Sequence, residues 1–296
     1  MRNLKSKMLL LAVLTIASLA LSAFQTNSAV NEDTDKKALL VVSFGTSYAD
    51  TREKTIVTSE KALAAAFPEY DMKRAFTSQI IIDKLSERDG IEVDNVAKAI
   101  EKIHQDGYGE VLVQPLHVIN GAEFHELITE LSPYSEKFAK FAIGQPLLSS
   151  AEDYVKMVEV ISQEMHMLAE HEAIVLMGHG THHPANSAYA ALDYVFKAEG
   201  YKNAYVGTVE GYPMLDTVME MLEADGIEKV TLAPLMVVAG DHAQNDMAGD
   251  EADSWKIMLK GKGYEVDTML VGLGEMEGIH QMYIEHAQAA AEGEGH

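Results

Sequence analysis

Short apolar runs alternate with longer amphipathic segments along most of the chain. Residues 38–44 are rich in β-branched residues and end at a Gly-Thr-Ser turn, which is typical of a buried parallel strand followed by a loop. The pattern predicts strands at residues 38–44, 72–76, 110–115, 138–143, 173–177, 204–210, from 230 onward, and 266–271. It predicts helices at residues 51–67, 93–104, 123–131, 151–168, 185–197, 214–224 and 276–290. This alternation indicates an α/β fold in which helices cover both faces of parallel sheets.

The order of elements repeats, and so do residues within it. The segment 111–125 and the segment 230–246 share one frame, and both follow an Asp-Gly pair. The matched residues are Pro115 with Pro234, Leu116 with Leu235, Val118 with Val237, and Gly121 with Gly240. We therefore predict two similar α/β halves, residues 37–160 and 161–296, with their loops around one cleft, because ligands of open parallel sheets bind beyond the carboxyl ends of the strands.

The two halves differ at three matched strand ends. The first half carries Phe44, Gln79 and Glu123, and the second half carries His179, Glu210 and His242. Two imidazoles and a carboxylate are a common ligand set for a first-row divalent metal. We predict that His179, Glu210 and His242 bind such a metal, although each of the three, taken alone, is also compatible with a structural or solvated role.

Other histidines leave more than one interpretation open. His125 follows Glu123 by two residues at the expected cleft mouth, where it is either an exposed ligand or solvated surface. His182 and His183 are either proton carriers beside His179 or surface residues. His117 lies within a strand pattern and is expected in the core or in the cleft wall.

Composition narrows the classes of partner. The chain has 296 residues, with 23 basic and 46 acidic residues and a formal net charge of −23. Binding to duplex nucleic acid depends on neutralising phosphates, so this balance argues against a nucleic-acid partner. An acidic protein attracts cations, divalent metals included. The absence of cysteine excludes disulfides, thiolate metal sites and cysteine nucleophiles.

Nucleotide and acyl-transfer chemistry also lack their usual sequence signals. The Gly-rich turns after the strands have neither the Gly-x-Gly-x-x-Gly spacing nor a following Gly-Lys-Ser/Thr. A Gly-x-Ser-x-Gly elbow is absent as well. We therefore expect no nucleotide cofactor.

The first 29 residues are typical of a secretory signal peptide. A basic segment, residues 1–7, precedes an apolar run from Met8 to Leu21 that is short for a bilayer span. Small and polar residues follow, and cleavage is expected after Ala23 or Ala29. We expect a periplasmic protein that has no membrane span after cleavage.

Several motifs resemble one enzyme family. They are Gly178-His-Gly-Thr, the Val206–Glu210 segment, the run from Pro234 to Asp246, and Asp253-Ser-Trp-Lys256. Together they resemble the class II tetrapyrrole chelatases, and among these the anaerobic-type sirohydrochlorin cobaltochelatases. The resemblance implies two Rossmann-like halves that face each other across a central cleft. It also implies that His179, Glu210 and His242 bind the incoming metal and that Glu123 faces them.

The function implied is insertion of Co²⁺, or of Fe²⁺, into sirohydrochlorin without ATP and with release of two pyrrole protons. His179 and His242 would hold the metal and accept a proton, and Glu123 would guide the metal or take the second proton. Cations near the cleft, among Arg52, Lys54, Lys73 and Arg74, would offset repulsion of the substrate carboxylates. An exported protein also allows an alternative, a periplasmic carrier of tetrapyrrole or metal with His125 as a haem ligand at a subunit contact. Ferrochelatase activity and a homo-oligomer remain open.

Overall fold

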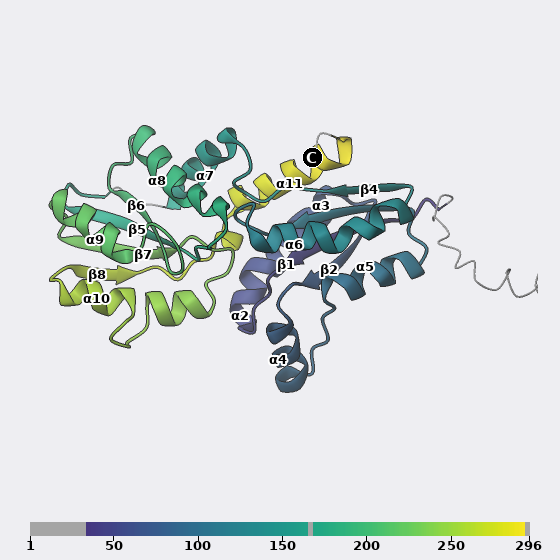
Figure 1. The fold of residues 1–296 in the computed structure, drawn as a ribbon, viewed down its shortest axis with the longest axis horizontal. Helices are drawn as coiled ribbons and strands as arrows, with labels where there is room; N and C mark the ends of the chain where they lie inside the picture. Colours follow the sequence, from purple (N-terminus) through teal and green to yellow (C-terminus); the bar gives the residue numbers. More distant parts are fainter. Residues whose placement is uncertain (1–33, 165–167, 294–296) are drawn as a thin grey trace, which may run out of the picture.

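The computed structural model describes residues 34–164 and 168–293, which form two four-stranded parallel sheets (Figure 1). The first sheet has the order β2-β1-β3-β4 and the second the order β6-β5-β7-β8. The first contains β1 (Lys37–Ser43), β2 (Asp71–Phe76), β3 (Glu110–Pro115) and β4 (Lys140–Ile143). The second contains β5 (Glu172–Gly178), β6 (Ala204–Thr208), β7 (Lys229–Pro234) and β8 (Glu265–Thr268). The identical strand orders confirm the predicted α/β fold of two similar halves.

Helices cover both faces of each sheet, as continuous apolar strands require. After its first residue, β1 is buried throughout, and so is β5. The α-helices are α2 (Ala49–Arg52), α3 (Thr58–Ala66), α4 (Gln79–Asp89), α5 (Val96–Gln105), α6 (Ala122–Leu131), α7 (Ala151–Glu164), α8 (Ser187–Ala198), α9 (Leu215–Ala224), α10 (Trp255–Gly261) and α11 (Glu277–Glu292). Shorter 3-10 or π segments are η1 (Glu53–Val57), η2 (Ser132–Lys137), η3 (Pro184–Asn186), η4 (Ala243–Met247) and η5 (Leu273–Glu275).

Two helices were absent from the sequence prediction, and one was predicted as continuous. The prediction contained neither α4 nor α10, whereas the expected helix at residues 51–67 is divided by the π segment η1. The start of α4 is marked by Ser78, whose side chain accepts a hydrogen bond from the amide of Ile81, and its end by Gly90 in the left-handed region. These caps were the available sequence signal. In Figure 1, α4 projects below the first half.

The final helix runs from the second sheet back to the first. Figure 1 shows α11 extending from the middle of the molecule along the first half, where it contacts α3, β3 and β4. His286 of α11 bonds Asp153 of α7 through Nε2 at 3.0 Å and the backbone oxygen of Gln145 through Nδ1 at 3.0 Å. One hydrophobic cluster contains buried residues of both halves, such as Leu39, Leu176 and Ile279. The two halves are therefore packed through a shared core.

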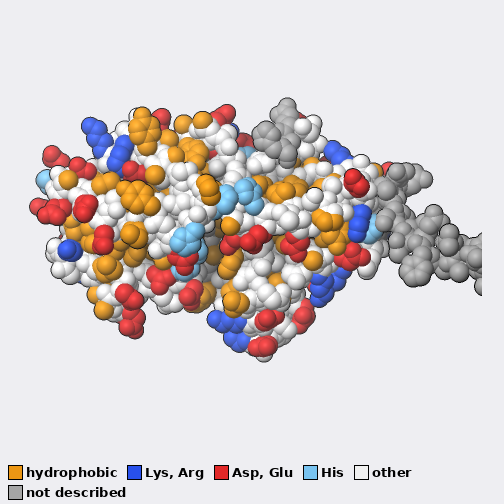
Figure 2. All heavy atoms as spheres, viewed as in Figure 1, with side chains coloured by type: hydrophobic (Ala, Val, Ile, Leu, Met, Phe, Trp, Pro, Cys, Tyr) orange, Lys and Arg blue, Asp and Glu red, His pale blue; other side chains and the backbone are white. Residues whose placement is uncertain are grey.

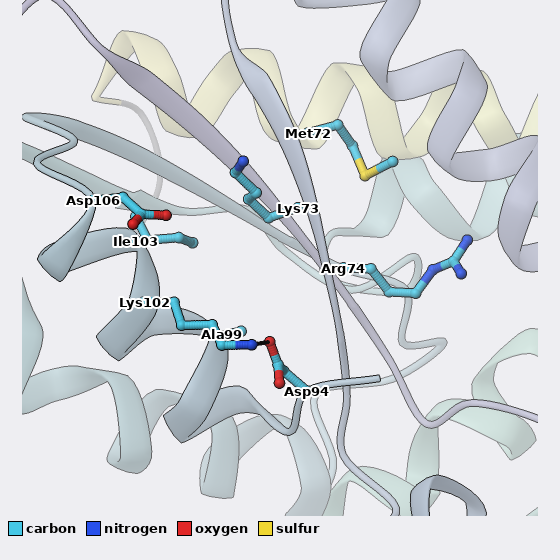
Figure 3. Close-up of a pocket in the computed structure, with 8 residues that line it drawn as sticks. All are labelled: Met72, Lys73, Arg74, Asp94, Ala99, Lys102, Ile103 and Asp106. Atoms are coloured by element: carbon cyan, nitrogen blue, oxygen red, sulfur yellow. Dashed lines mark hydrogen bonds and ion pairs between the residues drawn. The ribbon is translucent and has the colours of Figure 1, made fainter. Parts of the chain in front are cut away.

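Two of the cations expected near the cleft lie elsewhere. Lys73 and Arg74 border a hollow of about 520 Å³ beside the middle of the edge strand β2 (Figure 3). Arg74 pairs with the buried carboxylate of Glu60, and Lys73 lies over the Tyr108 ring. Arg52, in contrast, donates to the backbone oxygen of Thr46 at 3.0 Å, just beyond the carboxyl end of β1. Long cationic side chains are thus positioned by tertiary partners that the sequence does not reveal.

The predicted signal peptide, residues 1–29, lies outside the described residues. Within residues 34–164 and 168–293, no helix has the length and apolar character needed to cross a membrane.

Candidate active site

His179 follows β5, at the centre of the second sheet, and is partly buried. Its Nδ1 lies 2.9 Å from the backbone oxygen of Gly180. A carbonyl oxygen only accepts hydrogen bonds, so Nδ1 must carry the proton. Nε2 is then the ring atom with a lone pair, available to a metal ion or to a proton.

In His242, Nδ1 is also engaged, but by a different partner. It precedes the π segment η4, and its Nδ1 lies 2.5 Å from the Oδ2 atom of Asp246. The carboxylate fixes the orientation of the imidazole, as in the carboxylate–histidine–metal arrangement of many metal sites. Asp246 was not singled out from the sequence, although its spacing of four residues from His242 in a helical segment was the signal.

The structure brings His179 and His242 together. Their ring centroids lie 4.8 Å apart with the ring planes at 82°. Two imidazoles that share one tetrahedral metal at about 2.1 Å have ring centres about 5 Å apart, so the spacing of this pair is compatible with binding one ion. In both rings Nδ1 is engaged, so Nε2 is the nitrogen that a metal ion can take.

The backbone of Glu210, but not its side chain, contacts this pair. Its amide donates to the carbonyl oxygen of His179 at 2.8 Å, while its side chain is exposed. Among the described residues, no group of three or more His, Asp or Glu side chains is close enough to form a metal site. The structure thus brings the two imidazoles together but does not place the carboxylate of Glu210 with them.

The matched residues of the first half also lie together. Phe44, Gln79 and Glu123 line one hollow of about 240 Å³. The Glu123 side chain is 49% exposed and lines this hollow together with Phe44 and Leu127. Partial removal from water raises the pKa of Glu123, and the nearby His179 opposes this rise. The effect of His179 links Glu123 to the opposite half.

One matched pair in the sequence alignment was wrong by one residue. The amide of Glu210 bonds the oxygen of His179, and the equivalent bond in the first half joins the amide of Ser78 to the oxygen of Phe44. Glu210 therefore corresponds to Ser78, not to Gln79. The two segments diverge at this point, because α4 begins at Gln79, whereas a loop separates Glu210 from α9.

The alignment of Glu123 with His242 is confirmed by the sheet register. Pro115 pairs with Val42, and Pro234 pairs with Met177 in the same way. The two loops then keep equal lengths up to Gly121 and Gly240, whose carbonyl oxygens both accept an amide hydrogen bond from four residues on. This register leaves Glu123 and His242 at corresponding places in the two halves.

A second pair of histidines joins the halves. His125 of α6 and His183 of the loop before α8 have ring centroids 4.8 Å apart. His125 is exposed, His183 is partly buried and His182 is exposed. Figure 2 shows histidine side chains gathered near the middle of the long axis, with acidic side chains beside them and most Lys and Arg nearer the periphery. Another contact between the halves joins Tyr48 Oη to Asp241 Oδ1 at 3.0 Å.

Comparison with known proteins identifies the family. A family model described as cobalt chelatase (CbiK) matches residues 37–292. The chain belongs to the cobalt chelatase (CbiK) family.

Curated members of the cobalt chelatase family are similar over nearly their whole length. A sirohydrochlorin cobaltochelatase of Salmonella typhimurium is 47% identical over 255 residues, which cover 86% of this chain and 96% of that protein. The sirohydrochlorin cobaltochelatase CbiKC of Nitratidesulfovibrio vulgaris is 33% identical over 260 residues, covering 86% and 90%. The predicted family resemblance is thus confirmed.

Solved structures support the fold assignment. SirB from Bacillus subtilis with Fe³⁺ has a TM-score of 0.60 at 15% identity, covering 88% of this chain and 97% of SirB. DR2241 from Deinococcus radiodurans, described as similar to chelatases, has a TM-score of 0.54 at 13% identity, covering 88% of this chain and 59% of DR2241. At these identities the likeness concerns the fold alone, and it agrees with two Rossmann-like halves.

Gly180 should be essential to the backbone geometry beside His179. Its φ is +83°, and a Cβ there would lie 2.8 Å from backbone atoms of Glu210 and Gly211. We expect Gly180→Ala to lower the free energy of unfolding by roughly 2 kcal/mol more than Gly200→Ala. Gly200 is the matched control, since its φ is +95° but nothing lies within 4 Å. Equal losses in urea unfolding would contradict the predicted backbone clash.

Buried His117 should make stability depend on pH. Burial lowers its pKa to about 4 from 6.5. The unfolded chain therefore binds a proton that the folded chain excludes, and stability falls as pH decreases from about 6.5 to about 4. We expect His117→Met to remove about 3 kcal/mol of this loss, measured by urea unfolding at several pH values. The exposed control His182→Gln should keep the wild-type slope, and an unchanged slope in His117→Met would refute the account.

Proposed function

We propose that this chain inserts Co²⁺ into sirohydrochlorin without ATP, as a metal chelatase of the lyase class. Membership of the cobalt chelatase family and two curated relatives named sirohydrochlorin cobaltochelatase support this proposal. The observation that carries it is the pair His179 and His242, whose rings lie 4.8 Å apart with Nδ1 of each engaged and Nε2 left free. Fe²⁺ is the second metal to compare.

Metal insertion exchanges one divalent cation for two protons. The two pyrrole N–H bonds of sirohydrochlorin break, their nitrogens bind the metal, and each proton passes to a base. Nε2 of His179 and of His242 first holds the substrate metal and then, once it leaves, offers a lone pair to a proton. Asp246 stabilises the imidazolium that forms at His242, because the Nδ1–H bond to its carboxylate strengthens when the ring becomes positive.

Glu123 is the proposed acceptor of the other proton. It corresponds to His242 in the opposite half, and partial removal from water raises its pKa, which increases its affinity for a proton. Bases on both halves would let the two protons leave by separate routes. Glu210, beside His179, would supply an oxygen ligand and offset part of the metal charge after its side chain turns inward.

His242→Ala should abolish this activity without unfolding the protein. The side chain is partly exposed and makes its polar contact within η4, so the core is not disturbed. We expect the rate of cobalt insertion into sirohydrochlorin to fall by at least about 100-fold, measured by absorbance, with an unchanged urea midpoint. The control His171→Ala removes an exposed imidazole at the opposite, amino-terminal end of β5 and should keep full activity. Retained insertion in His242→Ala would contradict the assignment.

A second candidate is haem or tetrapyrrole binding in the periplasm. It is favoured by the exposed His125, whose ring lies 4.8 Å from that of His183 where the halves meet, and by the signal-peptide pattern of residues 1–29. His125 would bind the haem iron. This role is compatible with chelatase activity, because His125 is separate from the pair His179 and His242.

Protein from a periplasmic extract tests this candidate. We expect an intact mass that begins after Ala23 or Ala29, and a Soret band that His125→Ala removes and His182→Ala keeps. Protein found only in the cytoplasmic fraction, with residues 1–29 retained, would exclude export. A protein without pigment, before and after haem addition, would exclude haem binding and leave the chelatase proposal unaffected.

A further inference from the structure

His117 is a buried imidazole whose ring has no hydrogen-bond partner. Its side chain is 8% exposed, and neither Nδ1 nor Nε2 bonds any of the described residues. A buried polar group without a partner is uncommon and costs on the order of 1–3 kcal/mol. Metal binding by His179 and His242 gives this residue no role.

Glu123 is the polar group beside this ring. Nε2 of His117 lies 3.7 Å from Oε2 of Glu123, just beyond hydrogen-bond length. The other contacts leave the ring nitrogens free: Phe124 packs edge-on, and the amide of Leu147 and the hydroxyl of Tyr283 donate to the backbone oxygen of His117. In the tautomer with the ring proton on Nδ1, Nε2 and the ionised carboxylate of Glu123 are both acceptors, and no hydrogen bond can close the gap between them.

The second half shows that the scaffold does not need an imidazole here. The amide of Leu147 bonds the oxygen of His117, and the amide of Leu273 bonds the oxygen of Met236 in the same way. His117 therefore corresponds to Met236, as Glu123 corresponds to His242. In the first half the imidazole of His117 lies beside Glu123, whereas the corresponding position in the second half is occupied by the thioether of Met236.

We propose that His117 is a positioning residue for Glu123. When Glu123 takes a pyrrole proton, its carboxyl becomes a donor and closes the gap to Nε2 of the neutral imidazole. No further reactant is needed, because the proton that leaves the macrocycle is the one that forms the O–H···N bond. Three other groups interact electrostatically with Glu123: His179, Glu126 and Tyr189. Glu126 lies on the same helix as Glu123, and His179 belongs to the pair with His242.

This inference rests on the proposed cobalt insertion, and two substitutions test it. His117→Met installs the residue that the other half uses, so the fold is expected to survive. We expect kcat for cobalt insertion to fall about tenfold, with KM for sirohydrochlorin within about twofold of wild type. His117→Gln retains an amide oxygen that can accept the hydrogen bond and should restore most of kcat.

A double-mutant cycle separates positioning from packing. In a Glu123→Gln background, His117→Met should have no further effect on kcat, whereas in the control background Glu126→Gln the tenfold loss should remain. Full kcat in His117→Met, failure of His117→Gln to restore it, or the same loss in the Glu123→Gln background would overturn the inference alone. Wild-type protein that inserts no cobalt would overturn the proposed function and this inference together.

Discussion

Parallel strand pairing fixes every position at the proposed site. In each sheet one strand, β1 or β5, lies between two parallel neighbours, and all three end at the same edge of the sheet. The loops after β1 and β3, and after β5 and β7, therefore begin side by side. The register sets Glu123 and His242 at corresponding distances from Pro115 and Pro234. A slip by two residues in either strand would separate the imidazoles and remove the site while leaving the sheet intact.

The duplicated scaffold carries two different sets of side chains. Phe44 and His179 occupy matched places, and so do Glu123 and His242, and His117 and Met236. The second half presents a pair of imidazoles with free Nε2 atoms, and the first half presents a carboxylate in a partly apolar hollow. We propose that the second half binds the metal and the first half accepts a proton. Two halves with identical side chains could not divide these roles.

The strands and the duplication could be predicted because buried parallel strands are continuous apolar runs and the matched prolines occur at fixed places. The proximity of His179 and His242 followed from their strand ends. The one-residue error at Gln79 arose because the similarity of the two segments does not show where a helix begins. Asp246 and the partner of Arg74 were not predicted, since side-chain pairing depends on rotamers and tertiary contacts that no periodicity encodes. The roles of Glu210 and His125 stay predictions.

Anomalous diffraction from a crystal soaked in Co²⁺ tests the central claim most directly. The account predicts a cobalt peak about 2.1 Å from Nε2 of both His179 and His242, with their Nδ1 atoms still bonded to Gly180 and Asp246. A cobalt ion bound at His125 and His183 instead, or an empty His179–His242 pair beside fully occupied cobalt elsewhere, would contradict it.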